Sequence, residues 1–446
     1  MSKSPWEQRV LQHIDTAQDE LVELCRDLVR IPSWDRDKRG EAEAAHRVGA
    51  ALEQHTIPVE FFQSHPSIDN LVATLERPAA KPRLLFNGHV DVVPPGSLDD
   101  WSVDPFGAEV KDGRIYGRGA LDMKGGVAAM TAAMWALHDV KVPLGGTVIL
   151  NVVGDEERQG ELGTGWCIKH IWKKIRADAC IVGEPSGAGV VGHTVGIGEK
   201  GPVWLKVTTR GRKAHGSMPL MGENAINRMM QLLAELLKRG PPTVPPPIKR
   251  EALIGQIARA MGVEPALLEP LMQGGGAPNL LYAAVDALTR TTLNVGTISG
   301  GVAANMVPDR CEAQLDFRIL PGQTPQDVVA ALAALATELG FGDAVHVELL
   351  NAFQGTQVPN FEKDRLVTTL LETSRQIVGS TICFMFPAAT DGRLLRVAGI
   401  PSTVAYGPGN TATAHAADEC IAIEDLVKVA KVFAVTAIRF LGLRSA

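Results

Sequence analysis

The chain lacks several features that mark specialised classes of protein. Its 446 residues carry a formal net charge of −6, so no excess of Lys and Arg is available to hold a nucleic acid. No apolar run is long enough to span a bilayer, and the first residues lack the apolar core of a signal peptide. We therefore expect a cytoplasmic protein with neither a nucleic-acid nor a membrane partner.

Cysteine is also scarce, with six residues scattered along the chain. No two of them form a Cys-x-x-Cys pair, which argues against a zinc-thiolate site, and their spacing does not indicate a disulfide framework. We interpret them as reduced thiols, mostly buried. Aromatic residues make up only 5% of the chain, with three tyrosines, so stacking in a binding pocket would fall mainly to Phe or Trp.

The pattern of apolar residues changes near residue 200. Before it, short apolar runs alternate with helical segments such as 124–138, as is typical of buried parallel strands with crossover helices. These runs are 70–75, 83–86, 146–153 and 179–182. After it, alternating strands and amphipathic helices indicate a small α+β domain inserted into an α/β protein. The strands are expected at 203–209, 312–319 and 345–350, and the helices at 224–238 and 325–339.

The segment 87–94 (NGHVDVVP) places His89 and Asp91 two residues apart, after an apolar run. Side chains at i and i+2 of a strand point to the same face, so Asp91 could hold the second ring nitrogen of His89. An imidazole held in this way is a tuned metal ligand. The alternative is a structural histidine at a strand end, which would be favoured for a lone histidine.

Asp122 lies in a glycine-rich segment, 117–126 (GRGALDMKGG), just before a predicted helix. The glycines allow a tight turn from strand to helix. Asp122 could simply cap that helix, because Asp is a favoured N-cap residue. Alternatively, its two oxygens could bridge two cations.

Three adjacent acids, Asp155, Glu156 and Glu157, follow the run that ends at Val153. Because like charges repel, a solvated acidic loop is the simpler interpretation. A cation would change the balance by neutralising one carboxylate. A neighbouring carboxylate would then be free to accept a proton from an activated water.

Glu184 and His415 complete the set of candidate ligands. Glu184 follows the run 179–182, and its alternative role is structural. His415 follows a glycine-containing loop, and its alternative role is a local pair with Glu419. In open α/β sheets, sites form at the strand ends where several of these residues lie. Two His and three carboxylates, with one carboxylate left free, suit zinc, cobalt or manganese.

The ordered set of motifs resembles that of the co-catalytic zinc peptidases and deacylases, the family of acetylornithine deacetylase, succinyl-diaminopimelate desuccinylase, aminoacylase-1 and the glutamate carboxypeptidases. The resemblance covers about residues 20 to 440. It implies an α/β fold with a mixed central sheet flanked by helices, as in zinc exopeptidases. The catalytic domain would occupy 1–200 and 353–446, and a lid and dimerisation domain would occupy 201–352.

The resemblance also implies two divalent metal ions, either zinc or, as alternatives, cobalt or manganese. One would be held by His89, Asp122 and Glu184, and the other by Asp122, Glu157 and His415, with Asp122 as the bridge. Glu156 would be the general base and Asp91 would orient His89. The peptide bond after Asp122 would be cis, as it often is in the family.

Residues of the inserted domain match further family positions. His215, in RKAHGSMP, matches the histidine that family dimers donate to the partner's active site, where it would stabilise an oxyanion. A homodimer through the lid domain is therefore expected. Asn305 and Arg318 match positions that bind the substrate backbone or carboxylate, and an Arg fork suits a carboxylate. The alternative for Arg318 is a salt bridge at a strand end.

The function that the resemblance implies is a metal-dependent hydrolase. It would cleave the amide bond of an N-acyl amino acid or small peptide that bears a carboxylate. One alternative keeps the site but changes the C–N bond, as in an aryl amine aminohydrolase or a carbamoyl hydrolase. A second alternative is a non-catalytic binding protein on this fold. Loss of a ligand or of Glu156 would signal it, and all of them are present.

Overall fold

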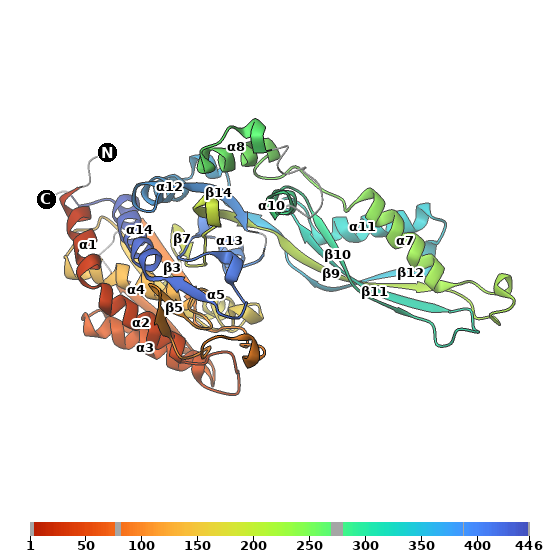
Figure 1. Cartoon of the computed structure of the whole chain (residues 1–446), viewed down its shortest axis with the longest axis horizontal. Coiled ribbons are helices and arrows are strands. Elements are labelled where there is room, and N and C mark those ends of the chain that lie inside the picture. Colours follow the sequence, from red (N-terminus) through yellow and green to blue (C-terminus); the bar gives the residue numbers. More distant parts are fainter. Residues whose placement is uncertain (1–3, 76–81, 269–279, 387, 445–446) are drawn as a thin grey trace.

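The computed structural model describes residues 4–75, 82–268, 280–386 and 388–444. Figure 1 shows two lobes: a large one that contains both ends of the described chain, and a smaller one that projects from it as a long arm. The large lobe is built on a nine-stranded sheet and the arm on a four-stranded sheet. The predicted α/β fold, a mixed central sheet flanked by helices with an inserted α+β domain, is confirmed.

The large sheet is parallel at its centre, where β6, β3, β7 and β15 lie side by side in that order. At one margin β2 forms a hairpin with β1 and pairs antiparallel with β6. The expectation of a parallel strand at 70–75 is therefore wrong, because the short turn after β1 reverses the chain. The strands are β1 (Val59–His65), β2 (Ile68–Leu75), β3 (Arg83–His89), β6 (Thr147–Val153), β7 (Ala179–Val182), β8 (His193–Glu199), β13 (Thr356–Gln357), β14 (Thr381–Phe386) and β15 (Thr403–Ala405).

Helices cover both faces of this sheet. Alternation along β3 sends Leu84 and Phe86 to one face and Leu85 to the other, and each face has its own apolar cluster. The first face is covered by α1 (Pro5–Thr16), α2 (Gln18–Arg30), α3 (Gly40–Gln54), α4 (Lys124–Asp139), α12 (Arg365–Ile377) and α14 (Ile423–Leu441). The second is covered by α5 (Thr164–His170), α6 (Trp172–Ile175) and α13 (Gly392–Ala398). A small sheet of β4 (Glu109–Lys111), β5 (Arg114–Tyr116) and β16 (Cys420–Ala422) lies beside them.

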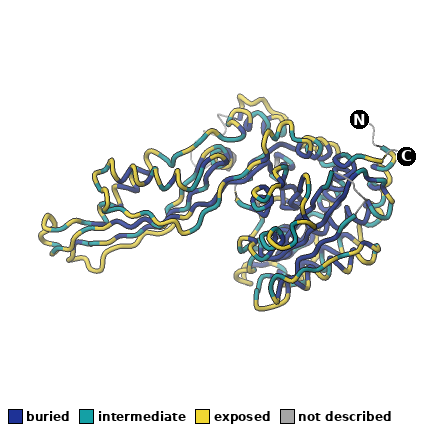
Figure 2. Tube along the Cα trace, turned by 180° about the vertical axis from the view of Figure 1, so that it is seen from behind, coloured by how far each residue is buried: buried dark blue, intermediate teal, exposed yellow. Residues whose placement is uncertain are grey.

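The arm is a four-stranded antiparallel sheet with two helices on one face. Its inner face buries alternate residues such as Val203, Leu205 and Phe317 against those helices. The strand order is β10 (Thr292–Gly300), β11 (Arg310–Ile319), β9 (Gly201–Arg210) and β12 (Val345–Ala352), and the helices are α7 (Ala225–Arg239) and α11 (Pro325–Glu338). Figure 2 shows buried residues forming a thin layer in the arm and a thick one in the large lobe.

The segment between α7 and β10 behaves differently from the rest of the predicted lid. Its helices α8 (Arg250–Met261) and α10 (Leu280–Thr289) contribute Leu253, Ile257 and Val285 to the core of the large lobe, not to that of the arm. Residues 240–248, predicted as a proline-rich loop, contain neither helix nor strand. No helix in the described ranges is long and apolar enough to cross a membrane.

The chain passes between the lobes four times: at Glu199–Gly201, between α7 and α8, between α10 and β10, and at Ala352–Thr356. The first and last of these crossings are neighbours, where β8 leads into β9 and β12 leads into β13. The strands are in close contact there, because a Cβ on Gly201 would lie 2.1 Å from the carbonyl oxygen of Phe353. The buried carboxylate of Glu199 forms a 2.7 Å ion pair with Arg396, whose guanidinium also donates to Thr356. We call these two crossings, with the Glu199–Arg396 pair, the hinge.

Candidate metal centre and active site

The candidate ligands come together at the carboxyl ends of the parallel strands. His89 is the last residue of β3, Glu156 and Glu157 follow β6, and Glu184 follows β7. The loop after β15 carries His415 to the same edge. Because neighbouring parallel strands end at one edge of a sheet, residues far apart in sequence meet there.

Asp122 reaches this edge from the turn before α4. A Cβ on Gly126 would lie 2.1 Å from the carbonyl oxygen of Gly183, so glycine allows α4 to pack directly on the end of β7. This contact places Asp122 beside Glu184. Asp122 does not cap α4, because Met123 occupies the N-cap position and no side chain caps the helix. The peptide bond from Asp122 to Met123 is cis, as the resemblance implies.

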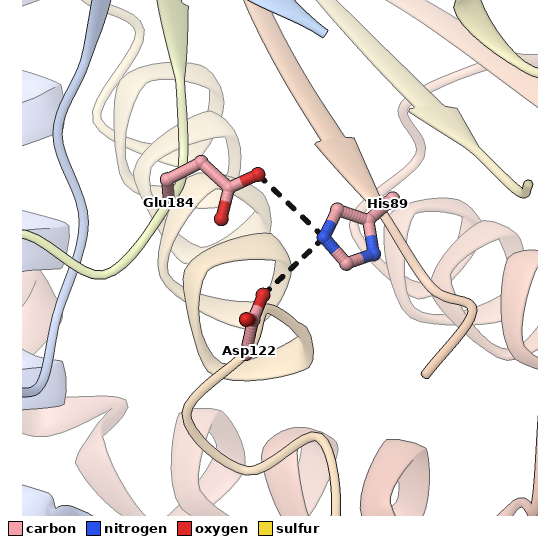
Figure 3. A group of neighbouring side chains, drawn as sticks. All are labelled: His89, Asp122 and Glu184. Atoms are coloured by element: carbon pink, nitrogen blue, oxygen red, sulfur yellow. Dashed lines mark ion pairs between the residues drawn. The ribbon is translucent and has the colours of Figure 1, made fainter. Parts of the chain in front are cut away.

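Figure 3 shows the first group of candidate ligands, His89, Asp122 and Glu184, pointing toward one another. The Nε2 atom of His89 lies 3.4 Å from Asp122 Oδ1 and 3.6 Å from Glu184 Oε1. Nε2 is buried and has no hydrogen-bond partner among the residues that the structure describes. Its other ring nitrogen, Nδ1, donates to the backbone carbonyl of Asp91 at 3.0 Å and lies 3.4 Å from the Asp91 carboxylate. Nε2 is therefore the nitrogen available to a cation.

The second group, Asp122, Glu157 and His415, shares one member with the first. His415 Nε2 lies 3.2 Å from Asp122 Oδ2 and 3.1 Å from Glu157 Oε1. Asp122 thus turns Oδ1 toward His89 and Oδ2 toward His415. A carboxylate with one oxygen in each of two ligand groups has the arrangement of a bridge between two cations.

Glu156 lies next to both groups but belongs to neither. Its Oε2 is 3.9 Å from His89 Nε2. The Asp91 carboxylate accepts hydrogen bonds from the backbone N–H groups of Glu156 (3.1 Å) and Glu157 (3.0 Å). Asp91 therefore positions the acidic loop as well as contacting His89, a role that the sequence pattern did not predict.

Asp155, the first of the three adjacent acids, turns away from the ligands. It has a left-handed backbone conformation (φ 67°), and its buried carboxylate is bound by Arg36 and by the backbone N–H of Leu162. The acidic loop is therefore not a solvated one. One acid anchors it, and the other two point toward the candidate site.

Glu419 is a residue of this site that the sequence interpretation missed. The sequence suggests Glu419 as a local partner of His415, but its fully buried carboxylate instead faces the turn that carries Asp122. One oxygen accepts hydrogen bonds from the N–H groups of Gly119, Leu121 and Asp122, and the other pairs with Arg118. Glu419 thus fixes the backbone of the candidate bridging residue. Only its position four residues after His415 pointed to it.

The protonation of the ligands indicates a site suited to cations. Burial would lower the pKa of His89, but the surrounding carboxylates outweigh burial and raise this pKa well above its usual range. Asp122 and Glu157 raise the pKa of His415 to about 10, and burial raises the pKa of Glu184 to about 7. Protons thus balance the crowded carboxylates, and bound cations would replace those protons. The donor set of imidazole and carboxylate, with the unpartnered His89 Nε2, fits two divalent cations.

The arm residues predicted for the site lie apart from it. His215 and Asn305 sit together at the far tip, where Gly216 N donates to Asn305 O at 2.7 Å. The strand β9, with ten residues, separates the tip from the hinge by about 30 Å. Arg318 lies at the hinge end, opposite Pro202, and pairs with Asp316 at 3.0 Å. The structure thus shows the alternative for Arg318, a salt bridge, and brings none of the three to the ligands.

A mixed α/β sheet with two overlapping ligand groups at its parallel strand ends, and a buried free carboxylate beside them, is the arrangement of a two-metal hydrolase. Comparison with known proteins gives the family. Residues 85–439 match the model of peptidase family M20/M25/M40. The chain therefore belongs to this family, and it is a hydrolase that acts on amide bonds of acyl amino acids or peptides.

Individual relatives agree with this assignment. The chain is 30% identical to succinyl-diaminopimelate desuccinylase of Methylobacterium radiotolerans over 431 residues, 94% of this chain and 96% of that protein. Its fold is similar to that of an M20 family metallo-carboxypeptidase from Sulfolobus solfataricus, with TM-score 0.70, 23% identity, and 95% and 99% of the two chains covered. It is also similar to a Bacillus subtilis protein described as a dinuclear metal-binding M20 peptidase, with TM-score 0.66, 15% identity, and coverage of 96% and 100%.

Proposed function

We propose that the protein is a zinc-dependent deacylase or carboxypeptidase-type enzyme that hydrolyses N-acyl amino acids or small peptides. The observation that carries this proposal is the orientation of the Asp122 carboxylate, which directs one oxygen toward each of two histidines. His89 and Glu184 complete one cation site, and Glu157 and His415 complete the other. Zinc suits imidazole and carboxylate ligands without thiolate, and cobalt or manganese would fit the same donors.

Two cations held by these residues would supply Lewis acidity to the amide carbonyl and would lower the pKa of the attacking water. Glu156 accepts the proton of that water and passes it to the leaving amine, since it is adjacent to both ligand groups without belonging to either. Asp91 holds Glu156 in place through the backbone. The products are a carboxylate and a free amine.

The arm acts in this proposal as a lid whose tip serves a second copy of the chain. His215 and Asn305 cannot reach their own ligands across a ten-residue strand without a large motion, but a homodimer could present them to the partner's site. There His215 would stabilise the oxyanion. Arg318, at the hinge, would serve its own site by binding the substrate carboxylate in exchange for Asp316. The six free cysteines are consistent with action in the cytoplasm.

The test is a substrate panel with metal-loaded and chelator-treated protein. We expect N-acyl amino acids or dipeptides to be cleaved, activity to vanish on chelation, and zinc to restore it, with product masses as the readout. Cleavage of aryl amines or carbamoyl compounds alone would keep the site but change the reaction class. Turnover that survives complete metal removal would contradict the proposal.

If the partner subunit donates His215 to the active site, two inactive variants should complement each other. His215→Ala and Glu156→Gln should each be nearly inactive alone, yet mixing their dissociated subunits should restore about a quarter of wild-type activity. Half of the dimers would be mixed, and one of the two sites in each would be intact.

Mixing Glu156→Gln with Glu157→Gln is the matched control, because both changes affect the same side of the site and no intact site can form. A monomeric mass in solution, or no recovery in the first mixture, would contradict the shared site.

A further inference from the structure

The candidate active site opens into a cavity of about 270 Å³ whose lining has two chemically different parts. One part is formed by Glu156 and by four of the five candidate ligands, Asp122, Glu157, Glu184 and His415. The other part, which we call the neutral wall, is built from small or apolar residues. These are Pro185, Phe386, Ala388, Ala389, Thr390, Thr411 and Ala414. No Lys or Arg lines the cavity within the described part of the chain.

The basic side chains nearest in sequence to the neutral wall are already bound and buried. Arg393 donates to the backbone carbonyls of Thr390 and Gln159 and lies over the ring of Phe353. Arg396 forms the ion pair with Glu199. Both side chains are buried, and neither lines the cavity, so neither guanidinium faces a ligand placed there.

Two basic residues close to Asp122 in sequence also form contacts within the protein. Arg118 pairs with Glu419, and the Lys124 ammonium donates to the backbone carbonyl of Ile31. In addition, two divalent cations would carry four positive charges against the four carboxylates of Asp122, Glu156, Glu157 and Glu184. The part of the site that one subunit forms therefore has no net positive charge to offer to a second anion.

We infer that the neutral wall receives an uncharged acyl group and discriminates against an anionic one such as succinyl. This inference rests on the proposed function. A carboxylate placed against Phe386 and the alanines would lose its hydration without gaining a partner, which strongly disfavours binding. The substrate carboxylate belongs instead to the amino-acid part, toward Arg318. The specificity of this chain thus differs from that named for its desuccinylase relatives.

A pair of substrates that differ only in charge tests the inference. The N-succinyl derivative of one amino acid is compared with its succinamoyl derivative, in which an amide replaces the terminal carboxylate. We expect kcat/KM to be at least about tenfold higher for the neutral compound. Calorimetric titration of both compounds into Glu156→Gln protein, which should bind without turnover, should give the same order of affinities.

A positive charge placed in the neutral wall should reduce the discrimination against the succinyl compound. Ala388 is exposed, so Ala388→Lys is compatible with folding, and it should lower the neutral-to-succinyl ratio about tenfold. Val397→Lys, also exposed but on α13 and outside the cavity, makes the same charge change and should leave the ratio unaltered.

Preference of the wild-type protein for the succinyl compound would overturn the inference while leaving the proposed function intact. Cleavage of neither compound, nor of any other acyl amino acid, would overturn both.

Discussion

Replacing Glu156 with Gln should lower kcat by about 10²–10⁴-fold while the protein still folds and binds metal. This loss corresponds to roughly 3–5 kcal/mol of transition-state stabilisation. Glutamine keeps the size of the side chain but cannot carry the proton. Burial raises the pKa of Glu156 well above its usual range, as suits a group that must both accept and release a proton. Steady-state kinetics and metal analysis of the purified variant give the result.

The matched control for Glu156 is Glu161→Gln. Glu161 lies in the same loop but is exposed and takes no part in either ligand group. Its substitution should leave kcat within about twofold of wild type. If Glu156→Gln loses metal together with activity, Glu156 is a ligand and the assignment of the base must change. If it keeps more than a tenth of wild-type activity, the proton is carried by another group.

Replacing Glu419 with Gln should weaken both the fold and the metal site, although Glu419 belongs to neither ligand group. Its fully buried carboxylate accepts three backbone N–H groups and pairs with Arg118. The NH2 group of a Gln side chain would face either the backbone N–H groups or the Arg118 guanidinium, which are themselves donors. The buried positive charge of Arg118 would also lose its carboxylate partner. The expected loss is about 3–5 kcal/mol of unfolding free energy. Because the Asp122 turn is loosened, affinity for zinc should fall about 10–100-fold.

Urea unfolding measures the first effect, and calorimetric titration with zinc measures the second. Glu424→Gln is the control, since Glu424 is 80% exposed and pairs with Lys428 on the surface of α14. That change should cost less than about 0.5 kcal/mol. A Glu419 variant with lower stability but unchanged zinc affinity would show that Glu419 supports only the fold.

Local rules predict that several candidate ligands share one edge of the sheet, whereas their division into two groups is implied by the family resemblance. The apolar runs that become β3, β6 and β7 each end in a His or an acid, and parallel strands place such ends at one edge. Glu419 could not be predicted in this way. Its hydrogen bonds join residues about 300 positions apart, and no periodicity links Glu419 to Gly119.

Strand direction and the placement of the lid were also beyond the sequence. The pattern of β2 indicates a buried strand, but only the turn after β1 makes it antiparallel. Likewise, α8 and α10 interrupt the lid in sequence, yet their apolar faces pack on the large lobe. Amphipathicity shows that a helix buries one face without showing which neighbour covers it.

The arm also amplifies any change at the hinge. Strands β9 and β11 pair over ten residues between the hinge and the tip, so a rotation of about 10° at the hinge would move the tip by roughly 5–6 Å. Such a displacement exceeds the tolerance of a hydrogen bond. The close contact at Gly201 and the Glu199–Arg396 pair therefore influence the position of His215, which lies about 30 Å away. In the proposed homodimer, this ion pair inside one subunit would therefore influence where His215 lies in the active site of the partner.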